Sequence, residues 1–331
     1  MTSHVSFTCP VCCQSLVEVE DNVACLQCGS AYPQTLGIPD LRRPGAARSN
    51  TDAVIVEHMV ACYCGATYAE LLEIRLRGMP NYGDLIGHEV NYHLDHAARA
   101  GHMVAMFLAR LACNARTGSP DTALDIGCGS GGSLLALARQ YTQVVGIDPS
   151  LPDLILARKS LEMAATTNVR LVQGFGEALP FADDTFDYIN VLNVLEHVSD
   201  LDGLLRESRR VLRPGGSLAG DSRNRYDLFL PEPHVKVRWV GLLPKRLANR
   251  YVRWRKGVGY EGTYLNSYCD LRRALARQFG SDWRVIFPLV AAYGGPAWVD
   301  RWLRRLERLP LLPGMLLWVF PSHLVLAWVA T

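Results

Sequence analysis

The sequence lacks several features that would assign it to a broad class of protein. Its net charge is only +2 over 331 residues, so the overall charge points to neither nucleic acid nor membrane as the partner. No basic segment followed by an apolar run stands after Met1, which argues against a secretory signal. The uncharged stretch 309–331 is interrupted by prolines and a glycine. We therefore expect a cytoplasmic protein without a transmembrane span.

Without an export signal, the ten cysteines are expected to be reduced thiols and metal ligands rather than disulfides. Two C-x-x-C pairs lie near the N-terminus, with 12 residues between them: Cys9 with Cys12, and Cys25 with Cys28. Two such turns place four thiolates around one tetrahedral Zn²⁺, which leaves no open position for catalysis. The spacing thus predicts a structural zinc, with Cys13 as an alternative ligand to Cys12.

The segment around these cysteines resembles a zinc ribbon. Residues 16–24 read as a short hairpin between the two pairs, and the prolines and glycine after Arg42 read as a linker. We therefore predict a ribbon and linker over residues 1–48. We also expect the ribbon to have a core of its own and to melt independently of the rest of the chain.

Residues 123–126 form an apolar strand that contains Asp125, and a helical run follows over 133–140. Between them lie three glycines at alternate positions: Gly127, Gly129 and Gly131. A strand, a glycine turn and a helix in this order form the nucleotide-binding corner of an open α/β sheet. The next strand ends in Asp148, an acid that suits the ribose hydroxyls of NAD or of S-adenosylmethionine. Asp125 favours the second, because a carboxylate repels a pyrophosphate and attracts an ammonium.

Further motifs follow in order, ending with Leu195-Glu196-His197 and Leu212-Arg213-Pro214-Gly215-Gly216. Together with the glycine turn, this series resembles the class I S-adenosylmethionine-dependent methyltransferases of the type 11 group, over about residues 122–221. The resemblance implies a Rossmann-like α/β fold with seven strands, the last of them antiparallel, in addition to the ribbon. It implies that Asp125 and the three glycines surround the methionine end of S-adenosylmethionine and that Asp148 binds the ribose.

The chain departs from this family at two positions. Phe175 stands where the family often has an acid that meets the adenine amino group, so it either packs beside the adenine or belongs to the core. Glu177 is the alternative acceptor for that amino group. Asn193, which we also expect at the cofactor, replaces the first acid of the acid-x-x-Glu-His metal cluster of quinone-type O-methyltransferases, so a metal there is not expected. His197 is either a catalytic base or a histidine that orders its loop.

The remaining segments suggest how the chain is organised. We predict a helical lid over 49–120, with helices over 53–77 and 90–111, and a methyltransferase domain over 121–331. A group of aromatic and histidine residues in the lid is read as a polar helix face near a cleft: Tyr82, His88, Tyr92, His93 and His96. A basic insertion over 222–263 carries eight lysines and arginines between 236 and 256. It either selects the acceptor or is a solvated surface.

The C-terminal part returns to regular structure. A capping box at Ser267 and Asp270 opens a helix that ends near Phe279. Strands are expected over 283–289 and 323–329, with a basic amphipathic helix over 298–309. The uncharged stretch after it is expected mainly in the core, with contact to a membrane surface as the alternative.

The sequence therefore predicts an enzyme that transfers a methyl group from S-adenosylmethionine to oxygen or nitrogen of a small-molecule, glycan or lipid-linked acceptor. An rRNA or tRNA methyltransferase is the second hypothesis, because a ribbon followed by this domain also resembles some rRNA guanine methyltransferases. The all-cysteine second pair argues against it, since those ribbons usually carry a histidine there. The third hypothesis is a non-catalytic zinc-ribbon scaffold.

Overall fold

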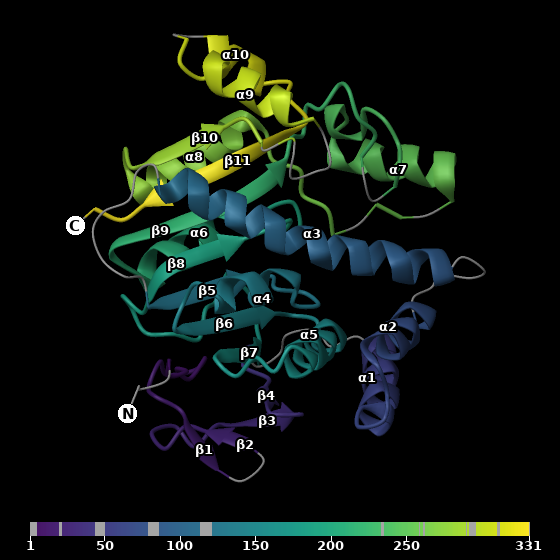
Figure 1. Ribbon diagram of the computed structural model, residues 1–331, viewed down its shortest axis with the longest axis vertical. Coiled ribbons are helices and arrows are strands. Elements are labelled where there is room, and N and C mark those ends of the chain that lie inside the picture. The colour runs from purple at the N-terminus through teal and green to yellow at the C-terminus, as the bar shows by residue number, and fades with distance from the viewer. Residues whose placement is uncertain are drawn as a thin grey trace.

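A central sheet of seven strands organises the chain (Figure 1). The computed structural model describes residues 5–19, 22–43, 50–78, 86–112, 121–232, 235–257, 259–260, 262–288, 290, 296–309 and 312–330. The strands are β5 (Thr122–Ile126), β6 (Gln143–Asp148), β7 (Val169–Gln173), β8 (Phe186–Val191), β9 (Leu212–Arg223), β10 (Trp283–Ile286) and β11 (Ser322–Trp328). Their order is β10-β11-β9-β8-β5-β6-β7, and β5 to β9 are mutually parallel. The last strand, β11, runs antiparallel to both β9 and β10, so the predicted fold class is confirmed.

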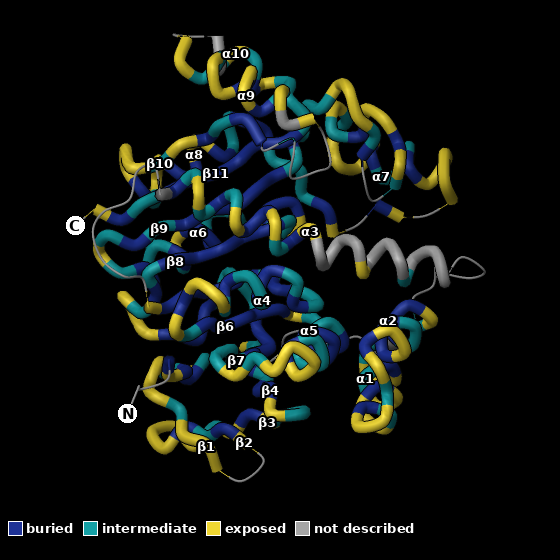
Figure 2. The backbone as a smooth tube through the Cα atoms, viewed as in Figure 1, coloured by how far each residue is buried: buried dark blue, intermediate teal, exposed yellow. Residues whose placement is uncertain are grey.

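Helices cover both faces of this sheet. One face packs against α3 (Ile86–Ala112), α4 (Gly132–Ala138) and α5 (Leu151–Met163), and the other against α6 (Leu201–Val211) and α8 (Tyr268–Phe279). In β5, Ala123 faces the first layer and Leu124 the second, as the alternation of a strand requires. All five residues of β5 are buried, which explains its almost continuous apolar sequence (Figure 2).

The N-terminal segment is a four-stranded antiparallel sheet at the β7 edge of the central sheet. Its strands are β1 (Val17–Val19), β2 (Asn22–Ala24), β3 (Ala31–Thr35) and β4 (Ile38–Pro39), so the predicted hairpin over 16–24 is confirmed. The amide of Leu41 donates to the carbonyl of Gln173 at 2.9 Å, and that of Thr8 to the carbonyl of Pro180 at 2.8 Å. The ribbon is therefore a separate sheet that hydrogen bonds attach to the end of β7 and to the loop after it.

The ribbon does not have a core of its own. Phe7 packs on Phe181 with ring centroids 5.9 Å apart, and the guanidinium of Arg170 lies 4.3 Å from the Phe7 ring. Buried Cys9 and Cys25 belong to the same apolar cluster as the strands of the central sheet. The expectation of a separate core was therefore wrong, because the segment buries its apolar side chains against β7 and the loop after it.

Two short helices replace the single helix expected over 53–77. They are α1 (Asn50–Cys62) and α2 (Tyr68–Arg77), and both pack on Ile155 and Leu156 of α5. A capping box starts α2, in which Thr67 accepts from the amide of Glu70 at 3.3 Å and the Glu70 carboxylate accepts from the amide of Thr67 at 2.7 Å. This reciprocal pair satisfies orphan amides and so restarts the helix after the turn at 63–65.

The basic insertion forms a small unit after β9. It contains η1 (Val240–Leu242) and α7 (Lys245–Lys256), which share an apolar cluster with Val237 and Tyr260. A hydrogen bond joins the two ends of this unit, since the amide of Arg225 donates to the carbonyl of Asn266 at 2.9 Å. The unit thus sits at the carboxyl end of β9, as its position in the sequence predicts (Figure 1).

The C-terminal elements follow the sequence closely. The Ser267 hydroxyl accepts from the amide of Asp270 at 3.2 Å at the start of α8, which confirms the predicted capping box. The basic helix is α9 (Ala297–Leu306), followed by α10 (Leu312–Leu317). Residues 322–328 form the buried strand β11. Among the residues that the structure describes, no helix combines the length and the apolar composition needed to cross a bilayer.

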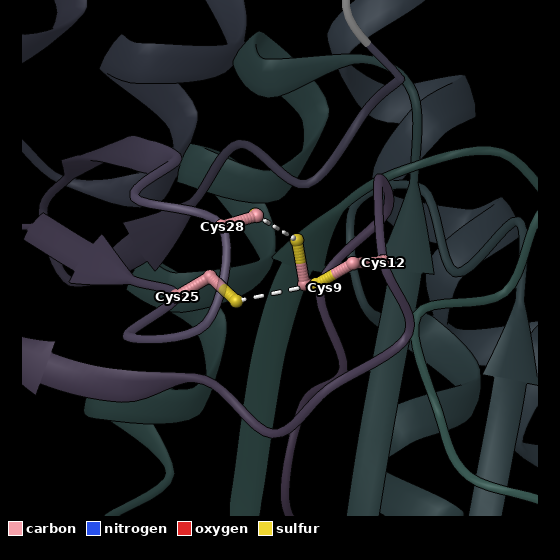
Figure 3. A group of neighbouring side chains, drawn as sticks. All are labelled: Cys9, Cys12, Cys25 and Cys28. Carbon is pink, nitrogen blue, oxygen red and sulfur yellow. Dashed lines mark hydrogen bonds between the residues drawn. The ribbon is translucent and has the colours of Figure 1, made fainter.

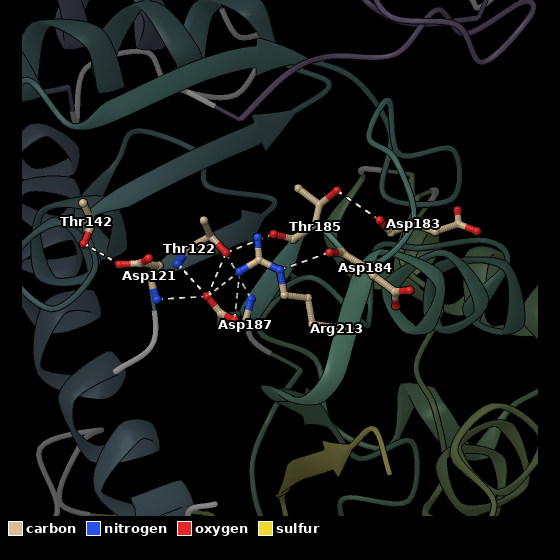
Figure 4. Close-up of polar contacts among 8 residues, drawn as sticks. All are labelled: Asp121, Thr122, Thr142, Asp183, Asp184, Thr185, Asp187 and Arg213. Atoms are coloured by element: carbon tan, nitrogen blue, oxygen red, sulfur yellow. Dashed lines mark hydrogen bonds and ion pairs between the residues drawn. The ribbon is translucent and has the colours of Figure 1, made fainter. Parts of the chain in front are cut away.

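A polar network fastens the amino ends of β5 and β8 (Figure 4). The Asp187 carboxylate accepts from the amides of Asp121 and Thr122, both at 2.9 Å, and pairs with Arg213 at 3.1 Å. Burial by itself would raise the pKa of Asp187, but these hydrogen bonds hold it below its ordinary value. The network lies at the edge of the sheet opposite the glycine turn, so we assign it a structural role.

Candidate functional site

The glycine turn joins the end of β5 to the start of α4 and is fixed to β6. The amide of Gly127 donates to the carbonyl of Ile147 at 2.8 Å, and that of Gly129 to the carboxylate of Asp148 at 2.9 Å. Gly127, Gly129 and Gly131 all have positive φ, of 69°, 48° and 88°. The turn therefore holds a backbone shape that other residues adopt only under strain.

The space around the backbone differs between Gly127 and Gly129. A Cβ on Gly127 would lie 2.2 Å from Val194, so this position lets the loop after β8 approach the turn. Around Gly129, in contrast, no heavy atom of the described residues, its chain neighbours aside, lies within 4 Å of the place of a Cβ. A ligand can therefore reach the backbone at Gly129, and the positive φ disfavours other residues there. A ligand-binding turn requires both properties.

Asp148 ends β6 directly beside this turn. Its two carboxylate oxygens accept from the amides of Gly129 and Ser150, at 2.9 and 2.8 Å. Burial, with the nearby charge of Asp153, raises the pKa of Asp148 to about 7. Among the described residues each oxygen accepts from one donor, and a carboxylate oxygen can accept from two, so this carboxylate is oriented and able to accept from a pair of hydroxyls.

Asp125 is enclosed more deeply than the sequence suggested. Its side chain is 1% exposed and accepts from the Asn190 amide at 2.6 Å and from the Ser133 hydroxyl. Burial raises its pKa to about 6, although both hydrogen bonds act in the opposite direction. Sequence reasoning missed Ser133 and Asn190. Asn190 could have been found, because a parallel pairing of the two strands places it opposite Asp125.

The remaining predicted cofactor residues follow the next strand ends of the same sheet edge. Phe175 and Glu177 come after β7, and both are partly exposed. Phe175 belongs to none of the apolar clusters found among the described residues. Asn193 follows β8 with φ of 54°, and its amide donates to Asp221 at 2.7 Å. The predicted residues therefore gather at the carboxyl ends of four neighbouring strands.

The loop after β8 carries His197 on its surface and Glu196 inside. The His197 ring is exposed, with Nδ1 3.4 Å from the carbonyl oxygen of Gly262 in the insertion. Glu196 is 2% exposed, and its Oε2 has no hydrogen-bond partner within the described structure. Burial and the charge of Asp221 raise the pKa of Glu196 to about 8. The segment that follows the insertion contacts this residue, since the amide of Tyr264 donates to the Glu196 carbonyl at 2.6 Å.

Sequence reasoning missed the polar surroundings of Glu196. Asp221 on β9 and Glu232 in the insertion are both buried, and their charges act on Glu196. The Tyr260 hydroxyl is also buried and lacks a hydrogen-bond partner among the described residues. Because these groups come from three separate segments, no local motif in the sequence could have joined them.

The four predicted zinc ligands lie together in the ribbon (Figure 3). Their sulfur atoms all lie within 4.8 Å of one another, with Cys9 to Cys28 at 3.6 Å and Cys12 to Cys25 at 3.4 Å. Tetrahedral zinc with Zn–S bonds of about 2.3 Å needs sulfur separations of about 3.8 Å, so the group fits this ion. Cys13 is exposed and lies outside the group, which favours Cys12 as the ligand.

Local hydrogen bonds support the same assignment. The amide of Cys13 donates to the carbonyl of Cys9, and that of Gly29 to the carbonyl of Cys25, so each pair forms the same tight turn. The hydroxyl and the amide of Ser30 lower the pKa of Cys28 to about 6, whereas burial and hydrogen bonds with the neighbouring thiols raise that of Cys12.

The aromatic and histidine group of the lid is not placed by the structure. Tyr82 lies outside the described residues. His88, Tyr92, His93 and His96 fall on the backbone of α3, but their side chains also lie outside the described part.

Comparisons with known proteins concern the central domain. Residues 124–220 match the family described as "Methyltransferase domain". A demethylmenaquinone methyltransferase of Shouchella clausii is 39% identical over 100 residues, which are 29% of this chain and 43% of that protein. A ubiquinone biosynthesis O-methyltransferase of Azorhizobium caulinodans is 32% identical over 121 residues, 35% of this chain and 47% of that protein. The chain thus spans less than half the length of these curated relatives.

The YcgJ protein of Bacillus subtilis aligns with a TM-score of 0.44 and 19% identity, covering 70% of this chain and 99% of that chain. The family match coincides with the segment from β5 to β9, which carries the glycine turn, Asp148 and the loop with Glu196. Residues 124–220 of this chain therefore match a methyltransferase domain.

Proposed function

We propose that this protein transfers a methyl group from S-adenosylmethionine to a small-molecule acceptor. The observation that carries the proposal is the turn at Gly129, which is open to a ligand and hydrogen-bonded to Asp148 at the next strand end. A cofactor with a ribose and an amino acid moiety fits a carboxylate with free acceptor positions beside exposed backbone. When bound, S-adenosylmethionine supplies an activated methyl group on a sulfonium.

The chain's own residues would hold this cofactor along one edge of the sheet. Asp148 accepts from the ribose hydroxyls, and the backbone at Gly127, Gly129 and Gly131 borders the methionine end. Asp125 supports this turn through Ser133, at the start of α4, and adds negative charge for the ammonium. Phe175 packs beside the adenine, with Glu177 as acceptor for its amino group and Asn193 at the neighbouring strand end.

The acceptor enters between this edge and the insertion. Most of the rate enhancement then comes from holding the acceptor atom in line with the methyl group. A hydroxyl acceptor must also lose a proton, and Glu196 is better suited than His197 to accept it. Glu196 is buried, its pKa is about 8 and its Oε2 has no partner among the described residues, whereas the His197 ring is exposed.

A transfer assay tests the proposal directly. We expect label from S-adenosylmethionine to appear in a small-molecule or lipid extract when it is incubated with the protein. The names of the two relatives above favour such acceptors over RNA. Label in total RNA would support the rRNA or tRNA alternative instead. Binding of S-adenosylhomocysteine without transfer to any of these pools would support the scaffold alternative.

The pKa of Asp148 predicts how cofactor affinity depends on pH. The ionised carboxylate accepts from hydroxyls better than the protonated form, so binding releases a proton below the pKa of about 7. We expect the affinity for S-adenosylhomocysteine to rise about tenfold between pH 6 and pH 8 and then to level off. Because the pKa of Asp125 is about 6, its protonation should lower the affinity further as the pH falls through 6. Calorimetry across this range checks the prediction, and a flat profile contradicts it.

We also propose that the ribbon binds one structural zinc through Cys9, Cys12, Cys25 and Cys28. The group matches the donor set and the separations of a closed zinc site. Four thiolates leave no position for a substrate, so the metal would stabilise the fold and take no part in methyl transfer.

A further inference from the structure

The insertion exposes large apolar side chains in unusual density. Seven of them lie between residues 228 and 254: Leu228, Phe229, Leu230, Trp239, Leu242, Leu247 and Trp254. Trp254 is 77% exposed, the most of any tryptophan among the described residues. Single exposed apolar residues are common, but grouped ones mark surfaces that bind a partner.

Helix α7 orders part of this surface into one face. Ala248 and Val252 are buried against the insertion's own cluster. Residues on the opposite side follow helical spacing and are all exposed: Arg246, Leu247, Arg250, Arg253 and Trp254. This face therefore presents cations and apolar side chains together, and we call it the α7 face.

The charge of the segment 235–260 within the insertion is of one sign. Eight lysines and arginines lie between residues 236 and 256, and no acidic residue occurs from 235 to 260. The chain as a whole carries a net charge of only +2, so this positive charge is local. A partner with a negative surface is thus the complement of the insertion.

A second helix shows the same combination independently. On α9, Leu303 is buried, and residues at helical spacing on another side are exposed: Trp298, Arg301, Trp302 and Arg305. Met315 and Trp318, in and after α10, are 70% and 48% exposed. Both α7 and α9 lie toward the end of the molecule away from the ribbon (Figure 1), where yellow marks their exposed residues (Figure 2).

The side chains distinguish between two negatively charged partners. An RNA would use the arginines for phosphates and the tryptophans for stacking, but it offers nothing to bury exposed leucines such as Leu242 and Leu247. A bilayer surface can bind the arginines, the tryptophans and the leucines, because phosphate headgroups lie above an apolar layer and tryptophan favours the boundary between them.

We propose that the α7 face, the neighbouring insertion residues and α9 dock on a membrane that contains anionic phospholipids. The insertion follows β9, so docking turns the acceptor entrance toward the bilayer. The acceptor is then an amphiphile drawn from the membrane, a conclusion that rests on the proposed function. The docking itself does not require methyl transfer.

Vesicle flotation tests the proposal on the full chain without cofactor or acceptor. We expect binding to vesicles of phosphatidylcholine with phosphatidylserine and little binding to phosphatidylcholine alone. Each cation near an anionic surface contributes about fivefold to binding, so the pair Arg246→Glu and Arg250→Glu should weaken it more than about tenfold. The matched pair Arg206→Glu and Arg273→Glu changes exposed arginines of α6 and α8 and should change binding less than about twofold.

A second variant separates the lipid from other anionic partners. Leu247→Ser with Trp254→Ser should also weaken flotation, and should do so at high salt, where charge is screened. Thermal unfolding and affinity for S-adenosylhomocysteine should match the parent protein in every variant.

Three results would overturn the docking proposal. They are no flotation by the parent protein, equal effects of the two arginine pairs, and no effect of the serine variant. Binding of a single-stranded RNA that is lost only in the Arg246 and Arg250 pair, without flotation, would assign the surface to RNA. A failed transfer assay would leave flotation untouched, so the two proposals fail separately.

Discussion

Loss of the zinc site is expected to destabilise the methyltransferase domain as well as the ribbon. Cys9→Ser removes a buried side chain that we propose as a zinc ligand, and a structural zinc contributes several kcal/mol of folding free energy. Since Phe7, Cys9 and Cys25 belong to the main apolar cluster, we expect one unfolding transition whose midpoint falls by about 5–15 °C. Calorimetry and metal analysis of the purified protein measure both effects, with about one zinc per chain in the parent and none in the variant.

Cys13→Ser is the matched control for this experiment. Cys13 is exposed and lies outside the group of four, so its loss should change neither zinc content nor the unfolding midpoint. An early transition of the ribbon alone, with the rest of the chain unfolding as before, would contradict the shared core. Equal effects of the two substitutions would contradict the assignment of ligands.

The second large effect is expected at Asp148. Asp148→Ala removes the proposed acceptor for two ribose hydroxyls and the acceptor for the Gly129 amide, which orients the turn. Unpaired polar groups in a buried site cost about 1–3 kcal/mol, so the affinity for S-adenosylhomocysteine should fall between fivefold and 150-fold. Titration calorimetry measures this loss, and thermal unfolding should show that the variant remains folded.

Asp153→Asn provides the contrast. Asp153 pairs with Arg75 at 3.3 Å, and its charge contributes to the raised pKa of Asp148. Its removal should lower the pKa of Asp148 and shift the rise of affinity to lower pH, without loss of affinity at pH 8. If Asp148→Ala binds like the parent protein, the ribose does not lie at this carboxylate.

Much of the site could be predicted because its residues are close in sequence. The turn from Gly127 to Gly131 needs only a strand before it and a helix after it, and Asp148 ends the next strand. Parallel strands place their carboxyl ends at one edge of the sheet, so residues after each strand gather there. The same logic could not reach the surroundings of Glu196, because they include Asp221 on β9 and Glu232 in the insertion, which lie far from it in the sequence.

The sequence by itself determined the order of the elements, the glycine turn and the two cysteine pairs, since each depends on residues within about one turn or strand of one another. Only the tertiary structure decided that the ribbon shares the core of the sheet, because contacts such as Thr8 with Pro180 join residues far apart in the chain. It also decided which cations and tryptophans share a face on α7 and α9. The composition shows these residues, but only folding determines which of them remain in contact with solvent.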